Sequence, residues 1–147
     1  MKSKDIIDAL IKKGLAYEDL ENVSEAIKCY DKALKINPQS ETVWNTKGVL
    51  FDELEKFDEA IKCYDKALKI NPKYAWAWSN KGISLTNLKK FDEAIKCYDK
   101  ALKINPQDAE IWAIKGDAFL EMGKKGEAKK SFEKAHSLGD SYSIGND

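Results

Sequence analysis

Three cysteines and one histidine are the side chains in this sequence whose types could support thiol or metal chemistry. Cys29, Cys63 and Cys97 recur every 34 residues, and the single histidine is His136. A zinc site needs such ligands close together, usually as pairs spaced by about two to five residues. An interval of 34 residues instead places one cysteine in each structural repeat, and equivalent helices of successive repeats lie about 10 Å or more apart, too far for a disulfide. We therefore expect free thiols that pack between helices in a reducing compartment, and no metal.

His136 and the numerous carboxylates do not form a catalytic set either. At the place of His136, the other copies of the repeat described below carry Leu34, Leu68 and Leu102. Because this place is near the expected end of the last helix, a solvated helix cap is favoured over a general base. The acidic residues belong to solvated helices, where nothing raises their pKa, and the sequence has no phosphate-binding loop or nucleophile elbow. We expect a protein that is not an enzyme and binds no cofactor.

The charged residues exclude two large classes of partner. The 147 residues include 25 lysines, no arginine and 25 acidic residues, so no net field attracts nucleic acid or an anionic membrane. Arginine is the side chain that forks onto phosphate and guanine. No run reaches the roughly 18 apolar residues of a membrane span, and the opening MKSKDIIDAL is charged where a signal peptide is apolar. We expect a cytoplasmic protein with no nucleic-acid partner and no membrane partner.

A 34-residue repeat dominates the sequence. The segment EAIKCYDKALKINP occurs identically at residues 25–38, 59–72 and 93–106, and a looser copy, EAKKSFEKAHSLGD, begins at Glu127. The residues before each segment repeat as well. Four copies follow, at about residues 7–40, 41–74, 75–108 and 109–140, and they form one expected domain over residues 1–140. Residues 141–147 have no apolar period and are expected to be a frayed tail.

Each copy predicts two helices. Apolar residues recur in both halves of a copy at the three- and four-residue spacing of an amphipathic helix. Ser24, Asp58 and Asp92 are the predicted N-caps of the second helices, and three Asn-Pro pairs predict where these helices end. On the second helix of the first copy, Asp31 is expected to pair with Lys35, four residues later.

The order of large and small residues within a copy resembles the tetratricopeptide repeat, over nearly the whole chain. In the second copy this pattern consists of Trp44, Gly48, Phe51, Ala60, Tyr64, Ala67 and Pro72. The first copy lacks the tryptophan and the last has Asp140 in place of the proline, and such departures at the ends are typical of caps on an open array. The resemblance implies an all-α fold, a right-handed superhelical solenoid of antiparallel helix pairs with eight helices. The structural core that it implies consists of Trp44, Trp78, Trp112, Gly14, Gly48, Gly82, Gly116, Tyr30, Tyr64, Tyr98, Phe132, Ala26, Ala60, Ala94 and Ala128.

The resemblance also implies a function. Such arrays are usually protein-interaction scaffolds that hold a peptide or a partner helix in a concave groove, which is lined mainly by the first helix of each pair. By register, the expected groove residues are Ile11, Leu15, Asn45, Val49, Trp76, Ser79, Asn80, Ile83, Ala113 and Asp117, with Glu18, Asp52, Glu53 and Glu121 at the lip. An apolar floor with an acidic edge would suit an unknown protein or peptide whose segment is apolar and basic. The alternative for the acidic residues is a solvated face without a partner.

Trp76 differs from the other tryptophans in its repeat equivalents. Trp78 has a tryptophan at the equivalent position of two other copies, as a packing residue would, whereas Thr42 and Glu110 occupy the positions equivalent to Trp76. Two residues along a helix turn a side chain by about 200°, which takes Trp76 off the packing stripe. Two interpretations remain open: Trp76 anchors a partner, or its indole lies flat on lysine side chains.

One subclass of the family clamps the C-terminal carboxylate of heat-shock chaperones with lysine, asparagine and arginine at defined groove positions. At those positions this chain has Ile11, Leu15, Thr46, Trp76 and Asn80 or, starting one copy later, Asn45, Val49, Asn80, Glu110 and Ile114. Neither set collects cations. We therefore expect no chaperone-tail clamp.

Self-assembly is the alternative function. Nearly identical repeats can stack end to end, and apolar residues are expected on both terminal faces. They are Ile6, Ile7 and Leu10 at the N-terminal end and Phe132 and Leu138 at the C-terminal end. Stacking of these faces would make the chain an oligomerisation module.

Overall fold

The fold is built from α-helices. The computed structural model describes residues 2–139, and the predicted tail at 141–147 lies outside the described residues. Within residues 2–139 the eight helices are α1 (Ser3–Asp19), α2 (Val23–Ile36), α3 (Glu41–Glu53), α4 (Phe57–Ile70), α5 (Ala75–Asn87), α6 (Phe91–Ile104), α7 (Ala109–Glu121) and α8 (Lys125–Ser137). Each predicted copy contributes two of them, so the expected all-α fold with eight helices is confirmed.

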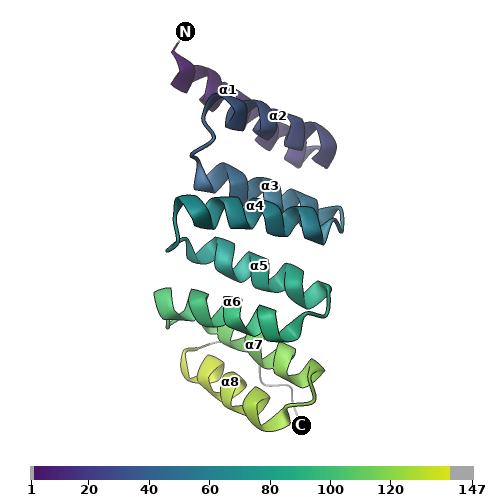
Figure 1. Cartoon of the computed structure of the whole chain (residues 1–147), viewed down its shortest axis with the longest axis vertical. Helices are drawn as coiled ribbons and strands as arrows, with labels where there is room; N and C mark the ends of the chain where they lie inside the picture. The colour runs from purple at the N-terminus through teal and green to yellow at the C-terminus, as the bar shows by residue number, and fades with distance from the viewer. Residues whose placement is uncertain (1, 140–147) are drawn as a thin grey trace. The chain divides into compact units, whose positions relative to one another are not determined.

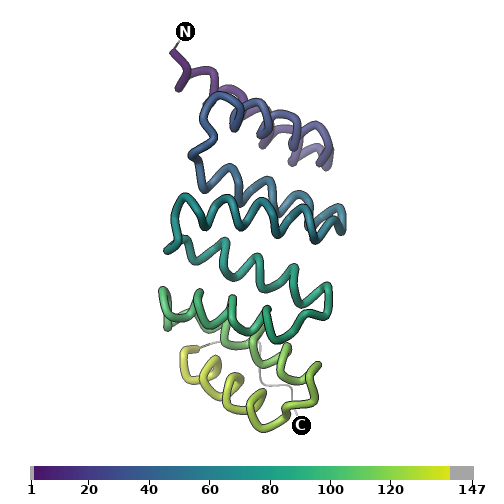
Figure 2. Tube along the Cα trace, viewed as in Figure 1, coloured from purple at the N-terminus to yellow at the C-terminus, as the bar shows by residue number. Residues whose placement is uncertain are grey.

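The two helices of each copy pack against each other as an antiparallel pair (Figure 1). The pairs are α1 with α2, α3 with α4, α5 with α6, and α7 with α8. The chain divides into two compact units, Met1–Pro72 with α1 to α4 and Lys73–Asp147 with α5 to α8. Within the first unit α2 also packs on α3, and within the second α6 packs on α7. Figure 2 shows the tight turn that joins the two helices of each pair.

The core of the first unit lies between consecutive helices and is centred on a tyrosine. Tyr30 is 1% exposed and clusters with Ala26, Leu34, Val43 and Leu50, so the cluster joins α2 to α3. The same ring explains a glycine of α1, because a Cβ atom at Gly14 would lie 2.8 Å from the Tyr30 ring. In the other copies the equivalent pairs are Gly48 with Tyr64, Gly82 with Tyr98, and Gly116 with Phe132.

The helix ends follow the sequence signals only in part. α2, α4 and α6 end directly before the Asn-Pro pairs, which confirms the predicted stops. The predicted N-caps are wrong: Ser24, Asp58 and Asp92 each stand second in their helix, and the N-cap positions are Asn22, Lys56 and Lys90. The reason is a sharp chain reversal at a residue with positive φ just before each N-cap, namely Glu21, Glu55 and Lys89. Asp58 and Asp92 instead favour the positive end of the helix dipole from within the first turn.

The sequence predicted an ion pair between Asp31 and Lys35, and this prediction is wrong. Lys47 of α3 lies 2.6 Å from the Asp31 carboxylate, and among residues 2–139 no ion pair joins Asp31 to Lys35. Asp99 of α6 and Lys115 of α7 form the equivalent bridge, also at 2.6 Å. The prediction considered residues four apart on a single helix. In the structure the neighbouring helix α3 supplies Lys47, whose side chain is only 17% exposed. Its attraction to Asp31 is therefore less screened by solvent.

Candidate protein-binding face

The expected groove residues of α5 follow one stripe along the helix. Trp76 is 69% exposed, whereas Ser79 is buried and both Asn80 and Ile83 are half-buried. The Ser79 hydroxyl donates to the Trp76 carbonyl oxygen at 3.0 Å, so its hydrogen bond is made within the helix. The apolar surface of this stripe is therefore the Trp76 indole followed, two turns later, by Ile83.

Trp76 borders a small hollow of about 100 Å³ in the second unit. The hollow lies between the start of α5, the end of α6 and the N-cap of α7, and it is lined by Ala75, Trp76, Ser79, Ala101, Asn105 and Asp108. Over residues 2–139, no lysine ammonium group lies above the Trp76 ring. Each of the other three indoles carries at least one: Lys47 over Trp44, Lys81 and Lys100 over Trp78, and Lys115 over Trp112.

The other tryptophans are packed into their copies. Trp44 and Trp112 are half-buried, and their indole N–H groups donate to the carbonyl oxygens of Pro38 at 2.9 Å and Pro106 at 3.0 Å. Trp78 is half-buried as well. A ring that is covered on one face and whose only donor is used serves packing, and this separates Trp44 and Trp112 from Trp76.

The expected groove residues of α7 combine apolar and acidic side chains. Ala113 is fully buried, Leu120 is 49% exposed, and Asp117 and Glu121 are both exposed one turn apart. Partial burial of the carboxyl group raises the pKa of Asp117, and the negative charge of Glu121 raises it further. The expectation that nothing raises the pKa of an acid on these helices is thus wrong for Asp117, because a like charge four residues away adds to its burial.

The first unit carries the corresponding stripes on α1 and α3. Leu15 is 50% exposed, and Ile11, Asn45 and Val49 are half-buried. The last residue of each of these helices, Asp19 in α1 and Glu53 in α3, is acidic and exposed. The structure therefore places the expected residues of the first unit on two helices, each with an apolar stretch that ends at an acid.

Two of the expected lip residues bind buried tyrosines, which the sequence analysis missed. Tyr30 donates a hydrogen bond to Glu18, and Tyr64 donates to Asp52 at 2.5 Å. In the third copy the Tyr98 hydroxyl lies 2.8 Å from the hydroxyl of Thr86. A signal was present in the sequence: twelve residues before each tyrosine stands a polar residue, whereas in the fourth copy Phe132 is preceded at that distance by Leu120.

The thiols and the acidic residues of the described part of the chain are not grouped as metal ligands. Cys29, Cys63 and Cys97 are buried and form no disulfide, and burial raises the pKa of Cys63 to about 11. His136 is exposed in the last turn of α8. Over residues 2–139, no group of three or more histidine, cysteine, aspartate or glutamate side chains is arranged to hold a metal ion.

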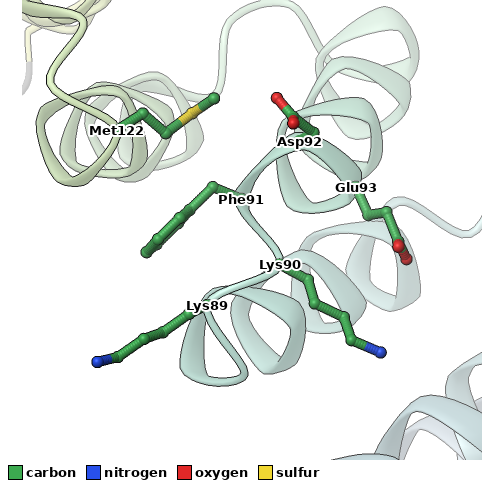
Figure 3. A pocket seen from close by; sticks show the side chains of 6 residues that line it. All are labelled: Lys89, Lys90, Phe91, Asp92, Glu93 and Met122. Atoms are coloured by element: carbon green, nitrogen blue, oxygen red, sulfur yellow. The ribbon is translucent and has the colours of Figure 1, made fainter.

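A larger hollow of about 300 Å³ lies at the turn between α5 and α6 (Figure 3). It is lined by Lys89, Lys90, Phe91, Asp92, Glu93 and Met122. In Figure 3 the ammonium groups of Lys89 and Lys90 point away from Met122, so Phe91 and Met122 supply its apolar part. We assign this hollow no chemistry.

The repeated sequence pattern matches the models of a known protein family. A tetratricopeptide repeat model matches residues 7–40, 42–74 and 75–108, and a second tetratricopeptide repeat model matches residues 97–130. The chain belongs to the tetratricopeptide repeat family. It is a helical-repeat protein-binding module with about four copies over residues 7–130, and repeats of this family are typically non-catalytic.

Solved structures of MamA share the fold of this tetratricopeptide repeat chain. A crystal structure of MamA is 26% identical, with a TM-score of 0.85 over 90% of this chain and 77% of that chain. MamA AMB-1 is 27% identical, with a TM-score of 0.78 over 92% of this chain and 75% of that chain. MamA from Desulfovibrio magneticus RS-1, at 20% identity and a TM-score of 0.84 over 94% of this chain and 78% of that chain, shows the fold alone.

Two further comparisons gave no match. No curated protein sequence is significantly similar to the chain. Among the helices of residues 2–139, none combines the length and the apolar character that crossing a membrane requires.

Proposed function

We propose that the first helices of the repeats, above all α5 and α7 of the second unit, hold an extended or helical segment of a partner protein. The observation that carries this proposal is the 69% exposure of Trp76 beside a hollow. A large indole left in water forgoes about 1.5 to 3 kcal/mol of burial free energy. Binding of a partner recovers this free energy, and tryptophan is one of the residue types enriched among such anchors.

The partner segment is apolar and carries lysine or arginine. Asp19, Glu53 and Glu121 are the last residues of α1, α3 and α7, and the last turns of these helices contain no basic residue. An acid at this end opposes the helix dipole and costs about 0.3 to 1 kcal/mol. Helix stability therefore does not account for these acids, whereas attraction of a cationic segment does.

Asp117 supports the same partner chemistry within the second unit. Its carboxyl group is partly buried one turn from Glu121, and both features raise its pKa. A lysine or arginine of the partner would relieve the repulsion between these two carboxylates. The exposed Leu120 between them offers an apolar contact for the stem of such a side chain.

The face is unsuited to clamping a terminal carboxylate. The positions that would hold one carry Ile11, Leu15, Thr46, Trp76 and Asn80. None of these side chains is a cation. We therefore propose an internal segment of the partner, rather than its C-terminal carboxylate, as the ligand.

A random peptide library displayed on phage tests this proposal. Selection on the wild-type chain is expected to enrich peptides with aromatic or aliphatic residues beside lysine or arginine. Trp76→Ala should weaken binding of the selected peptides by about 2 to 4 kcal/mol, and raised salt should weaken it further. Leu20→Ala removes an apolar side chain that is 74% exposed in the turn after α1, and it serves as the matched control.

The library also supplies the results that would refute the proposal. Selected peptides that bind Trp76→Ala as well as the wild-type chain would remove the anchor. Acidic peptides, or affinities that do not change with salt, would contradict the role of the acidic helix ends.

A further inference from the structure

The junction between consecutive copies of the first unit is built around one lysine. Lys47 of α3 lies 2.6 Å from Asp31 of α2. Its ammonium group lies 5.3 Å from the Trp44 ring and 5.7 Å from the Phe51 ring. The second unit repeats this construction at 2.6, 5.2 and 5.7 Å with Lys115, Asp99, Trp112 and Phe119. A junction lysine thus joins a carboxylate of the preceding helix to two rings of its own helix.

The same register places one half of a junction on α1 and the other half on α8. Lys13 of α1 occupies the position of Lys47, and its ammonium group lies 6.0 Å from the Tyr17 ring. Glu133 of α8 occupies the position of Asp31; its side chain is 64% exposed, and its contact with Lys129 on the same helix is 3.9 Å long. The two half-junctions are complementary in charge.

Apolar side chains accompany Lys13 on its face of α1. Ile6 is 38% exposed, Leu10 and Tyr17 are half-buried, and these residues share one helix face with Lys13 by their three- and four-residue spacing. Leu10 occupies the position that Trp44 fills in α3. The face of α1 therefore repeats the layout of the α3 face that packs on α2.

We propose that α1 of one chain docks on α8 of a second copy of the chain, with Lys13 and Glu133 in the roles of Lys47 and Asp31. The contact joins two different surfaces, so chains associate head to tail rather than as a two-fold dimer. This surface is separate from the Trp76 stripe and extends beyond the proposed binding of a partner segment.

The end faces differ from the inner junction in ways that weaken the contact. Leu10 replaces a tryptophan, and the exposed His136 replaces Leu34, which is 5% exposed inside the first unit. Less apolar area is buried as a result. Association is therefore reversible, requires high protein concentration and weakens with salt. Leu10→Trp combined with His136→Leu restores the inner-junction residues and should strengthen association at least about tenfold.

Sedimentation velocity from micromolar to near-millimolar concentration tests the contact with matched variants. Lys13→Glu should weaken self-association by roughly tenfold, because it places two carboxylates opposite each other. Lys12→Glu makes the same charge change at the adjacent, exposed residue and should leave association unchanged. A mixture of Lys13→Glu chains with Glu133→Lys chains should associate again, because both the native contact between Lys13 and Glu133 and the swapped contact bring opposite charges together.

Three results would overturn the proposal. In the first, both the wild-type chain and the Leu10→Trp, His136→Leu chain stay monomeric. In the second, Lys12→Glu weakens association as much as Lys13→Glu does. In the third, the mixture of the two charge variants does not recover association. Circular dichroism verifies that each variant is folded. Trp76→Ala should leave the association constant unchanged, so failure of the proposed groove and failure of the end contact give different results.

Discussion

At the scale of single residues, a tyrosine hydroxyl determines what stands at the lip of the binding face. Tyr30 is 1% exposed, and its hydroxyl reaches the carboxylate of Glu18 at the end of α1. Glu18 thus serves the repeat itself, whereas the neighbouring Asp19 is exposed and remains available to a partner. The acids of the predicted edge therefore have two different roles, which their residue types alone do not separate.

Glu18→Leu tests the role of this carboxylate in stability. The substitution leaves the buried Tyr30 hydroxyl without its acceptor and should lower the free energy of unfolding by about 1 to 3 kcal/mol. The double variant Glu18→Leu, Tyr30→Phe reproduces the Leu120 and Phe132 pair of the fourth copy and should recover most of the loss. Urea denaturation measures all of these values.

Asp19→Leu is the control for this double-mutant cycle. It removes an exposed acid next to Glu18 that opposes the helix dipole, so it should not destabilise the chain and should raise the free energy of unfolding by at most about 1 kcal/mol. A double variant that is no more stable than Glu18→Leu would contradict the pairing.

The buried thiol of Cys63 predicts a loss of stability at alkaline pH. Burial raises its pKa from an ordinary value of 9.0 to about 11 in the folded chain. The unfolded chain therefore releases this proton first, and the stabilisation, complete below pH 9, is lost progressively as pH rises from about 9 to about 11. Cys63→Ser, which introduces the residue found at this position in the fourth copy as Ser131, should be less pH-dependent in this window. Equal pH dependence of both chains in urea denaturation would refute this explanation.

At the scale of helices, the sequence predicts which elements form better than where they begin. Hydrophobic spacing and the Asn-Pro pairs gave the existence of the helices and the ends of α2, α4 and α6. Capping preferences predicted the wrong start for α2, α4 and α6. A turn residue with positive φ stands directly before each N-cap, and capping preferences do not take such a turn into account. At this position the first three copies have Glu21, Glu55 and Lys89, and the fourth has Gly123.

The positive-φ turns predict that glycine stabilises the chain. Glu55 has φ 57° and is exposed, so Glu55→Gly should raise the free energy of unfolding by up to about 1 kcal/mol by relieving a backbone conformation that disfavours side chains. Gly123, at φ 76°, has nothing within 4 Å of the position a Cβ would occupy. Gly123→Ala should therefore destabilise through the backbone alone.

Thermal denaturation of Glu55→Gly and Gly123→Ala measures both changes in stability. Glu55→Ala is the control, because alanine removes the carboxylate but keeps the strained backbone, and no gain is expected. If Glu55→Ala stabilises the chain as much as Glu55→Gly, the gain comes from the charge and not from φ.

At the scale of the whole molecule, the repeat pattern identifies the family, but the contacts between copies were not predictable from it. The tetratricopeptide pattern describes the residues within one copy, so it predicted the core tyrosines and the glycines that lie opposite them. The Lys47 and Asp31 bridge, 2.6 Å long, joins residues of different copies and depends on how the helices lie side by side. The exposure of Trp76 depends on the same placement, and spacing alone left its two interpretations open.

We propose that a partner protein is held at the Trp76 stripe. An affinity pull-down from a lysate of the source organism would compare the wild-type chain, Trp76→Ala and Leu20→Ala, with the retained proteins identified by mass spectrometry. We expect proteins that the wild-type chain and Leu20→Ala retain and that Trp76→Ala loses. The same proteins retained by all three chains would contradict the claim and place the binding site elsewhere.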